Sequence, residues 1–390
     1  MNKIKLDRED IILGKPMPWN IYRSDGSILL KKGLRITSEK NLDRLLQGEL
    51  LRDADNESNA DQPAQSTQKS TAEAAQTDKP QPLKKPDNPF EWINYFSLQL
   101  QQIYQNIENE KSASVDQIYK LLENIQKLNS AYHNQFLYAV HTYYPQNYSL
   151  MQPVYSALLC DLTAVTLDYD EQKRTSLLAA ALTSNIGMYS YQDTLNNQVS
   201  PLTEAQREEL QLHPYQSVQM LKSINVNDDL WLSSIAGHHE RNDGSGYPAQ
   251  ITTNTIKNES KIISLADSYL AMISKRSYSD TVPPKIALQS IYTSASDEDQ
   301  TMYLAFIKSL GIFPPGTYVK LANNEISVVT RQSEKSTLHC VVSSICNEKN
   351  EKFNIPVERD TSEKEFSITE FHTPEENMEV DPVVIWGYKK

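Results

Sequence analysis

Cysteine is scarce in this chain of 390 residues, which contains only Cys160, Cys340 and Cys346. The number is odd, and no two of them form a CxxC pair, which argues against a disulfide framework and against a cysteine-based zinc finger. We therefore expect reduced thiols that are buried or half-buried.

Long apolar runs are also missing. The longest, such as residues 177–182, fall far short of the roughly 20 residues that a membrane span needs. The first residues, MNKIKLDREDIIL, carry charges throughout and lack the apolar core of a signal peptide. These features predict a cytoplasmic protein with no membrane span.

An excess of positive charge is the third absence. Lys and Arg number 38 against 50 Asp and Glu, so the net charge is −12 and the chain as a whole repels a phosphate backbone. A nucleic-acid polymer is therefore disfavoured as a partner. The 39% of hydrophobic residues are enough for two or three folding units.

Residues 54–88 contain no aromatic and no β-branched aliphatic side chain, with Leu83 as their only large apolar residue. Such a segment cannot bury enough surface to offset its ordering entropy, so we expect a disordered linker. It leaves residues 1–53 as a small N-terminal β/α accessory module. Apolar runs at 19–22 and 28–30 predict a hairpin there, and the pattern after Ser38 predicts a helix that ends near Gly48.

Residues 89–310 show apolar positions at spacings of three and four, which predict an all-α domain. Thr203 and Gln206 form a capping-box pattern, and Pro214 predicts a break after His213. Residues 311–390 change to short alternating runs, which predict a C-terminal β module. Its strands are expected at 317–321, 325–330, 338–343 and 383–386. The expected fold class is thus mainly α, flanked by a small N-terminal α+β module and a C-terminal β module.

Four residues of the helical domain have side chains that bind metals: His213, the adjacent pair His238 and His239, and Asp267. Adjacent histidines on a helix point about 100° apart, so they suit two neighbouring ions, or one ion and one substrate oxygen. Spacing alone favours a plainer interpretation, in which the histidines are satisfied at a helix end and Asp267 is an exposed charge.

The sequence of residues 238–248, HHERNDGSGYP, resembles the signature of the HD-GYP family. This resemblance implies an HD-domain-like helical bundle and a metal-dependent phosphohydrolase. Members of the family cleave cyclic dinucleotides, chiefly cyclic di-GMP, with two or three iron or manganese-type ions.

The resemblance extends from about residue 150 to 295. It implies that His213, His238, His239 and Asp267 are metal ligands. It also implies that Gly246, Tyr247 and Pro248 form a substrate-binding loop, and that Arg276 lies in a basic segment near the substrate phosphates. A serine stands in that segment where the family usually has proline.

The sequence departs from the family at the residues that name it, because the His-Asp pair falls on Ser184 and Asn185. The family's first ligand histidine falls on Gln152, and its lysine falls on Met188. A site with two ions needs anionic ligands and a bridging carboxylate, which neutral Ser, Asn and Gln side chains do not supply. We expect these residues to face the same site as the retained ligands.

Three functions follow from this pattern. The first is a cyclic di-GMP signalling protein with a degenerate metal site, regulatory or binding rather than catalytic. It would hold one weakly bound Fe or Mn ion or none, and the GYP loop could meet a signalling protein. The second is an active cyclic di-GMP phosphodiesterase with a reduced metal site. The third is a protein-interaction scaffold.

The proposed linker gives a first testable prediction. Limited proteolysis should cut first between Ala54 and Asn88, because that stretch has almost no apolar anchor. Mass spectrometry of the early fragments measures this, and an initial cut inside residues 150–295 would contradict the proposed boundaries.

Overall fold

The computed structural model describes residues 3–6, 8–11, 21–23, 28–30, 50–53, 85–143, 148–189, 191, 198, 202–252, 255–274, 282–294, 299–333, 338–373, 378 and 380–388. The chain forms two compact units, Met1–Pro80 and Gln81–Lys390, which we treat separately. Three sequence predictions lie outside the described residues: most of the linker, the helix after Ser38, and the site residue Arg276.

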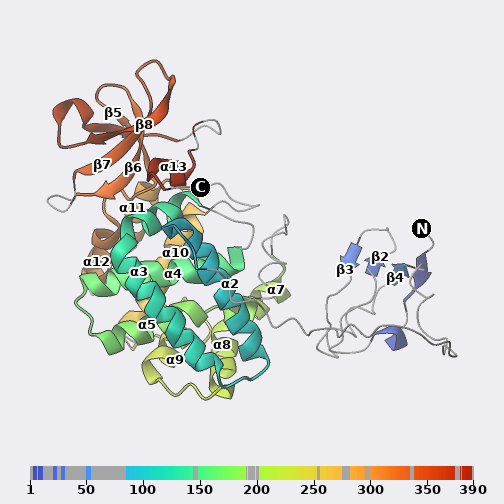
Figure 1. The fold of residues 1–390 in the computed structure, drawn as a ribbon. Helices are drawn as coiled ribbons and strands as arrows, with labels where there is room; N and C mark the ends of the chain where they lie inside the picture. Colours follow the sequence, from blue (N-terminus) through green and yellow to red (C-terminus); the bar gives the residue numbers. More distant parts are fainter. Residues whose placement is uncertain are drawn as a thin grey trace, which may run out of the picture. The chain divides into compact units, whose positions relative to one another are not determined.

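The first unit contains a four-stranded antiparallel sheet in the order β1-β4-β2-β3 (Figure 1). Its strands are β1 (Lys3–Lys5), β2 (Ile21–Arg23), β3 (Ile28–Leu30) and β4 (Leu50–Asp53), and a short 3-10 helix, η1, covers Arg8–Asp10. The two apolar runs of the expected hairpin pair as β2 and β3, with Ile21 opposite Leu30. Ile21 and Tyr22 of β2 are both buried.

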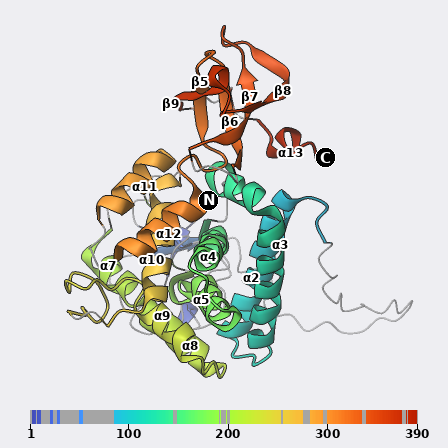
Figure 2. The same ribbon diagram turned by 90° about the vertical axis from the view of Figure 1, so that its left-hand side faces the viewer.

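The second unit is mainly helical, which confirms the expected fold class (Figures 1 and 2). Its helices before the sheet are α2 (Pro89–Glu108), α3 (Ser114–Thr142), α4 (Tyr148–Thr166), α5 (Glu171–Thr183), η3 (Ile186–Met188), α7 (Glu204–Gln211), α8 (His213–Ser223), α9 (Asp229–Ala236), α10 (Asn258–Ile273), α11 (Pro284–Thr293) and α12 (Gln300–Leu310).

Local sequence explains where several helices begin. Thr203 and Gln206 form the predicted capping box of α7, with side chain and backbone bonded in both directions. Pro214 stands in the first turn of α8, where its missing N–H costs no helical hydrogen bond. The predicted break is therefore a boundary between two helices, and His213 begins the second of them.

Helix α5 lies in the centre of the bundle. Its residues 177–182 are all fully buried, as expected for a helix that is apolar on every side. It packs against α4 and α9, and α4 also packs against α10 and α12. Trp231 of α9 donates its indole N–H to the Thr183 hydroxyl over 2.8 Å, which fixes the end of α5. The positions 184 and 185 follow directly after this anchor.

A five-stranded antiparallel sheet follows α12, in the order β8-β7-β6-β5-β9. Its strands are β5 (Tyr318–Leu321), β6 (Ile326–Gln332), β7 (Cys340–Cys346), β8 (Lys352–Asp360) and β9 (Ile368–Phe371), with a 3-10 helix, η5, at Lys364–Phe366. The backbone N–H of Gln332 donates to Asn134 Oδ1 over 3.1 Å, which joins β6 to α3.

The strand predicted at residues 383–386 is wrong. This segment forms a short helix, α13 (Pro382–Ile385), visible beside the sheet in Figure 2. Asp381 Oδ1 caps the helix by accepting the Val383 N–H over 2.9 Å, and Pro382 presets the helical backbone. Trp386 then packs its ring on Phe90, with centroids 6.4 Å apart. Capping and packing override the strand preference of Val383 and its apolar neighbours.

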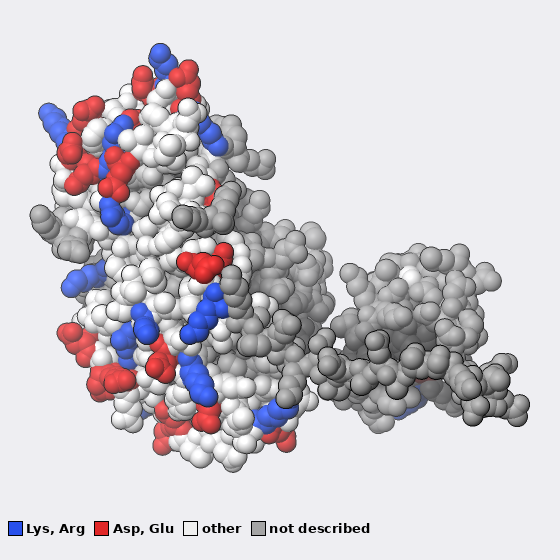
Figure 3. Space-filling view, viewed as in Figure 1, with Lys and Arg blue, Asp and Glu red and all other residues white. Residues whose placement is uncertain are grey.

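Two sequence expectations concern absent features. All three cysteines are free and buried, as predicted. None of the described helices is both long and apolar enough to cross a membrane. On the face of the second unit seen in Figure 3, basic and acidic side chains of the described residues are interspersed.

A buried ion pair joins three helices of the bundle. Asp161 of α4 accepts hydrogen bonds from Arg174 Nε (2.5 Å) and Arg174 Nη2 (2.9 Å) on α5. Asn129 of α3 donates to the same carboxylate over 2.8 Å. Asp161 is almost fully buried, so this pairing compensates its charge where water cannot.

We predict that Asp161→Ala lowers the free energy of unfolding by roughly 2–4 kcal/mol, because it leaves the Arg174 charge partly buried and unpaired. Asp161→Asn should cost less, since its amide oxygen still accepts one hydrogen bond. Urea unfolding followed by far-ultraviolet circular dichroism measures both variants. A loss below about 1 kcal/mol for the alanine variant would show that the pair contributes little.

Candidate metal centre

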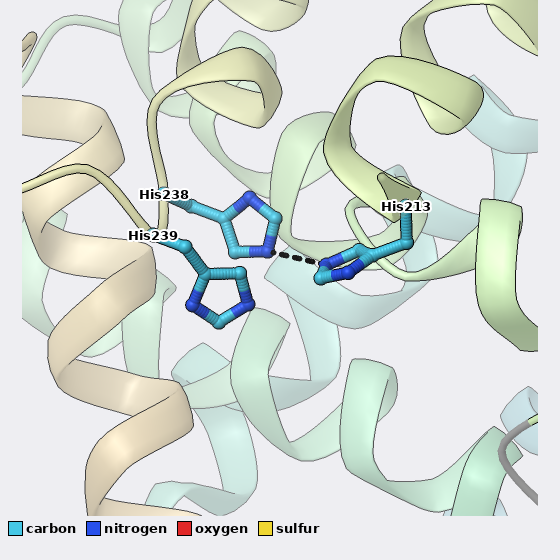
Figure 4. Close-up of side chains that lie close together, drawn as sticks. All are labelled: His213, His238 and His239. Carbon is cyan, nitrogen blue, oxygen red and sulfur yellow. Dashed lines mark hydrogen bonds between the residues drawn. The ribbon is translucent and has the colours of Figure 1, made fainter. Parts of the chain in front are cut away.

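Three histidines converge in the second unit (Figure 4). His213 is the first residue of α8, while His238 and His239 lie in the turn that follows the end of α9. The pair is thus placed just past a helix rather than on it. A side chain at Gly237 would lie 2.9 Å from Ser260 Oγ, so glycine allows this turn to approach α10 closely.

The ligand nitrogens of the three rings all lie within 4.8 Å of one another. The Nε2 atoms of His213 and His238 are 3.2 Å apart, the contact drawn as a dashed line in Figure 4. Both of these residues are fully buried, whereas His239 is half-buried. His213 and His238 are 25 residues apart in the sequence, so tertiary packing brings their rings together.

Backbone carbonyls determine which ring nitrogen carries the proton. Nδ1 of His213 bonds to the carbonyl of Leu210 over 2.6 Å, and Nδ1 of His238 bonds to the carbonyl of Ile235 over 2.7 Å. A carbonyl only accepts, so both Nδ1 atoms must donate, and each neutral ring presents the lone pair of Nε2.

Two lone pairs that face each other over 3.2 Å cannot form a hydrogen bond, so this contact calls for a cation between the rings. Two nitrogens on a tetrahedral metal, each about 2.0–2.1 Å from the ion, are about 3.3 Å apart. Carbonyl bonds to Nδ1 are also the usual support of metal-bound histidine. The residues therefore fit a metal ion.

Burial keeps these imidazoles in the neutral form that binds metals. It lowers the pKa of His213 to about 3, with a further lowering by the nearby His238. Burial also lowers the pKa of His238 to about 4, against the effect of its bond to the Ile235 carbonyl. The pKa of His239 is lowered well below its usual value, first by burial and then by its two histidine neighbours. A proton is therefore a poor substitute for a metal cation at this centre.

The loop from residue 240 to 251 supports His239. The ring of Tyr247 stacks on that of His239, with centroids 4.6 Å apart and planes 24° apart, and its N–H donates to the His239 carbonyl over 3.1 Å. Gly246 packs so tightly on this turn that a side chain there would lie 2.4 Å from the Arg241 nitrogen. Pro248 is exposed. Gly246 and Tyr247 thus position a candidate ligand directly.

Sequence reasoning missed Glu240. Its buried carboxylate accepts the backbone N–H groups of Ala249 (2.5 Å) and Ile251 (2.9 Å), which closes the loop. Its position directly after the histidine pair was the only signal, and that position does not distinguish a loop support from a ligand.

A second group of polar side chains, which we call the amide relay, consists of Asn185, Gln152 and Asp267. Asn185 Nδ2 donates to Gln152 Oε1 over 3.0 Å, and Gln152 Nε2 donates to Asp267 Oδ1 over 2.5 Å. The relay connects the end of α5 to α4 and α10. Gln152 thus contacts Asp267 directly, and Asn185 is linked to Asp267 only through Gln152.

Other expected site residues are placed differently. The hydroxyl of Ser184 bonds to the Ala181 carbonyl of its own helix over 3.3 Å. Met188 is half-buried in η3.

Among the residues that the structure describes, no carboxylate joins the three imidazoles within 4.8 Å, so Asp267 stands outside their group. Burial and then the Asp267 charge raise the pKa of Tyr247, which places this carboxylate electrostatically close to the stacked ring.

Comparisons with known proteins show what this chain is similar to. The family model of the HD domain matches residues 121–300. A cyclic di-GMP phosphodiesterase of Pseudomonas aeruginosa, PA4108, is 28% identical over 159 residues, which are 41% of this chain and 38% of the relative. The cyclic di-GMP phosphodiesterase PdeB of Borreliella burgdorferi is 24% identical over 191 residues, 49% of this chain and 50% of the relative.

The 3'3'-cGAMP-specific phosphodiesterase 3 of Vibrio cholerae is 29% identical over 163 residues, 40% of this chain and 34% of the relative. The chain thus spans about a third to a half of the length of these relatives. A solved structure of Bd1817, an HDG"Y"P protein from Bdellovibrio bacteriovorus, covers 79% of this chain and 99% of that one, with a TM-score of 0.46 and 15% identity.

The matched segment contains the three histidines, the amide relay and the GYP loop. Its resemblance by motif and its relatives point to the same group of proteins. Residues 121–300 of this chain thus match the HD domain, and the chain is similar to cyclic-dinucleotide phosphodiesterases of the HD-GYP type.

Proposed function

We propose that this chain is a cyclic-dinucleotide signalling protein. It binds cyclic di-GMP or a related cyclic dinucleotide and has a regulatory role, and it does not hydrolyse the nucleotide. The names of its relatives, phosphodiesterases of cyclic di-GMP and of 3'3'-cGAMP, support the ligand class. The amide relay is the observation that carries the regulatory role: at positions 152 and 185, two neutral amides bind each other and Asp267.

The proposed metal is a single Fe or Mn ion held weakly by His213, His238 and His239. When bound, such an ion supplies a positive charge that attracts a phosphate oxygen of the ligand. The chain's own residues orient the imidazoles through the Leu210 and Ile235 carbonyls. Asp267, which accepts the Gln152 amide at Oδ1, stays a sequence prediction as a further ligand of this ion.

Hydrolysis of a phosphodiester at this centre would need a second metal ion and a positive charge near the phosphate. A second ion requires an anionic bridge, and the Asn185 amide is neutral. Position 188, where the family has a lysine, carries the uncharged side chain of Met188 and cannot steady the charge that develops on a phosphate.

The ligand surface that we propose is the GYP loop. Tyr247 is half-buried and presents one ring face to His239, while Pro248 is exposed and available for a ligand or a signalling protein. Arg276 stays a sequence prediction as a phosphate contact, and a cytoplasmic location stays a prediction as well.

A second candidate function is an active phosphodiesterase with a reduced metal site. The orientation of His213 and His238, with both Nε2 lone pairs directed at one point, favours it, because such a pair is ready to hold an ion. A scaffold role without nucleotide binding is the third candidate, and no contact among the described residues favours it over the others.

Calorimetric titration with cyclic di-GMP, with and without Mn²⁺ or Fe²⁺, distinguishes these functions. We expect binding that metal strengthens, together with negligible hydrolysis when the products are followed by chromatography. Turnover at rates typical of enzymes, above about 1 s⁻¹, would establish the phosphodiesterase. If cyclic di-GMP does not bind under any of these conditions, the scaffold role is the remaining candidate function.

Metal content gives an independent prediction. Elemental analysis should find at most one tightly bound transition metal per chain, and His238→Ala should weaken Mn²⁺ or Fe²⁺ binding at least about tenfold, since it removes a ligand. His339→Ala is the matched control, because that histidine is exposed in the loop directly before β7. Two stoichiometric ions per chain would contradict the reduced site.

A further inference from the structure

We infer that Pro214 is a positioning residue, which keeps the Leu210 carbonyl free to accept the N–H of His213 Nδ1. The Nε2 lone pair of this ring is thereby directed at His238. This inference rests on the proposed ion at the three histidines. Pro214 offers no ligand atom of its own, so it acts on the centre through His213.

The backbone passes from α7 into α8 with hardly a break. Leu212, which ends the first helix and precedes the second, has helical φ and ψ angles of −84° and −12°. The N–H of Gln216 donates to the Leu212 carbonyl over 3.0 Å, as it would in a continuous helix. In such a helix the carbonyl of Leu210 would accept the N–H of residue 214. Proline has no N–H, and its ring clashes with a carbonyl four residues earlier, so this carbonyl is left for the His213 ring.

The other ring obtains its carbonyl in a different way. Helix α9 ends at Ala236, and Gly237 has φ and ψ angles of −107° and 3°, so the chain leaves the helical path there. His238 lies in the turn that follows and bonds through Nδ1 to the Ile235 carbonyl over 2.7 Å. At the junction of α7 and α8 the helical path continues. There the missing N–H of Pro214 does what the helix end does at α9.

The two fixed rings make the metal-free centre unfavourable. Because both carry their proton on Nδ1, they form no hydrogen bond with each other. If Leu210 no longer held Nδ1 of His213, the proton of this ring could reside on Nε2 instead. It would then be donated to the Nε2 lone pair of His238, which is 3.2 Å away. Such a bond would satisfy both rings without an ion, so Pro214 keeps the centre dependent on a cation.

The first experiment determines the tautomers without metal. In the full chain, labelled with ¹⁵N-histidine and kept in EDTA, the ring nitrogen shifts distinguish Nδ1–H from Nε2–H. The His213 signal is identified by its loss in His213→Gln. We expect Nδ1–H in wild type and a large fraction of Nε2–H in Pro214→Ala, whose new N–H takes the Leu210 carbonyl. An unchanged His213 tautomer in Pro214→Ala would overturn the inference.

His141 is the internal reference of this measurement. Its Nδ1 bonds to the Leu137 carbonyl over 2.7 Å, and its Nε2 accepts the Tyr269 hydroxyl over 2.6 Å. Its Nδ1–H tautomer should therefore be the same in wild type and in every variant.

The second experiment measures how strongly the centre depends on metal. Melting temperatures in EDTA and in Mn²⁺ are compared for wild type, Pro214→Ala and the control Pro284→Ala, which removes the proline from the first turn of α11. We expect Mn²⁺ to raise the melting temperature of wild type and of the control equally, and that of Pro214→Ala by less. Calorimetry should show Mn²⁺ binding about tenfold weaker in Pro214→Ala, as for other groups that orient a ligand.

A third variant separates the hydrogen bond from packing. Pro214 is buried, so its change to alanine also removes contacts. Pro214→Val restores most of the volume and supplies the same N–H, so it should weaken Mn²⁺ binding as Pro214→Ala does. If Pro214→Val binds Mn²⁺ like wild type, lost packing explains the alanine variant and the inference is wrong.

These outcomes distinguish the inference from the proposed function. If wild type binds no Mn²⁺ or Fe²⁺, the proposed ion fails, while the tautomers in EDTA still decide the role of Pro214. If wild type and both variants at position 214 bind Mn²⁺ equally well, the proposed ion stands and the inference fails.

Discussion

Two hydrogen bonds at helix ends determine the chemistry of this centre. His213 bonds to the carbonyl of Leu210 in the last turn of α7, and His238 bonds to that of Ile235 in the last turn of α9. The last four carbonyls of a helix lack partners within it, so a histidine three residues further on can take one. The same local arrangement occurs twice, and each time it directs Nε2 toward the other ring.

Much of this centre was predictable from local sequence. The capping box at Thr203 and the helix boundary at Pro214 depend on neighbouring residues, and their patterns are visible in the chain itself. The turn that carries His238 and His239 was not predicted, since the sequence analysis considered the pair as part of a helix. The resemblance to HD-GYP proteins further indicated that His213 and the pair at 238–239 belong together. The metal-ligand roles that it implies for these residues stay predictions.

The amide relay was only partly predictable. Gln152 lies 33 residues from Asn185 and 115 residues from Asp267, so no periodicity connects them. The resemblance predicted that these positions face one site, but not that two amides would bind each other there. The misassigned segment at residues 383–386 has a similar cause, since packing of Trp386 on α2 is a long-range contact that strand propensity does not include.

Charge explains why neutral side chains and a single ion belong together. The three imidazoles are neutral, since burial lowers the pKa values of His213, His238 and His239, and Asp267 is the one acid of the expected ligand set. One divalent ion leaves a net charge of about +1 beside that acid, which a phosphate can offset, whereas two would leave about +3 in a largely buried site. Amides at 152 and 185 add no negative charge to reduce that excess. The amide of Gln152, which hydrogen-bonds Asp267, therefore supplies no charge that would favour a second ion.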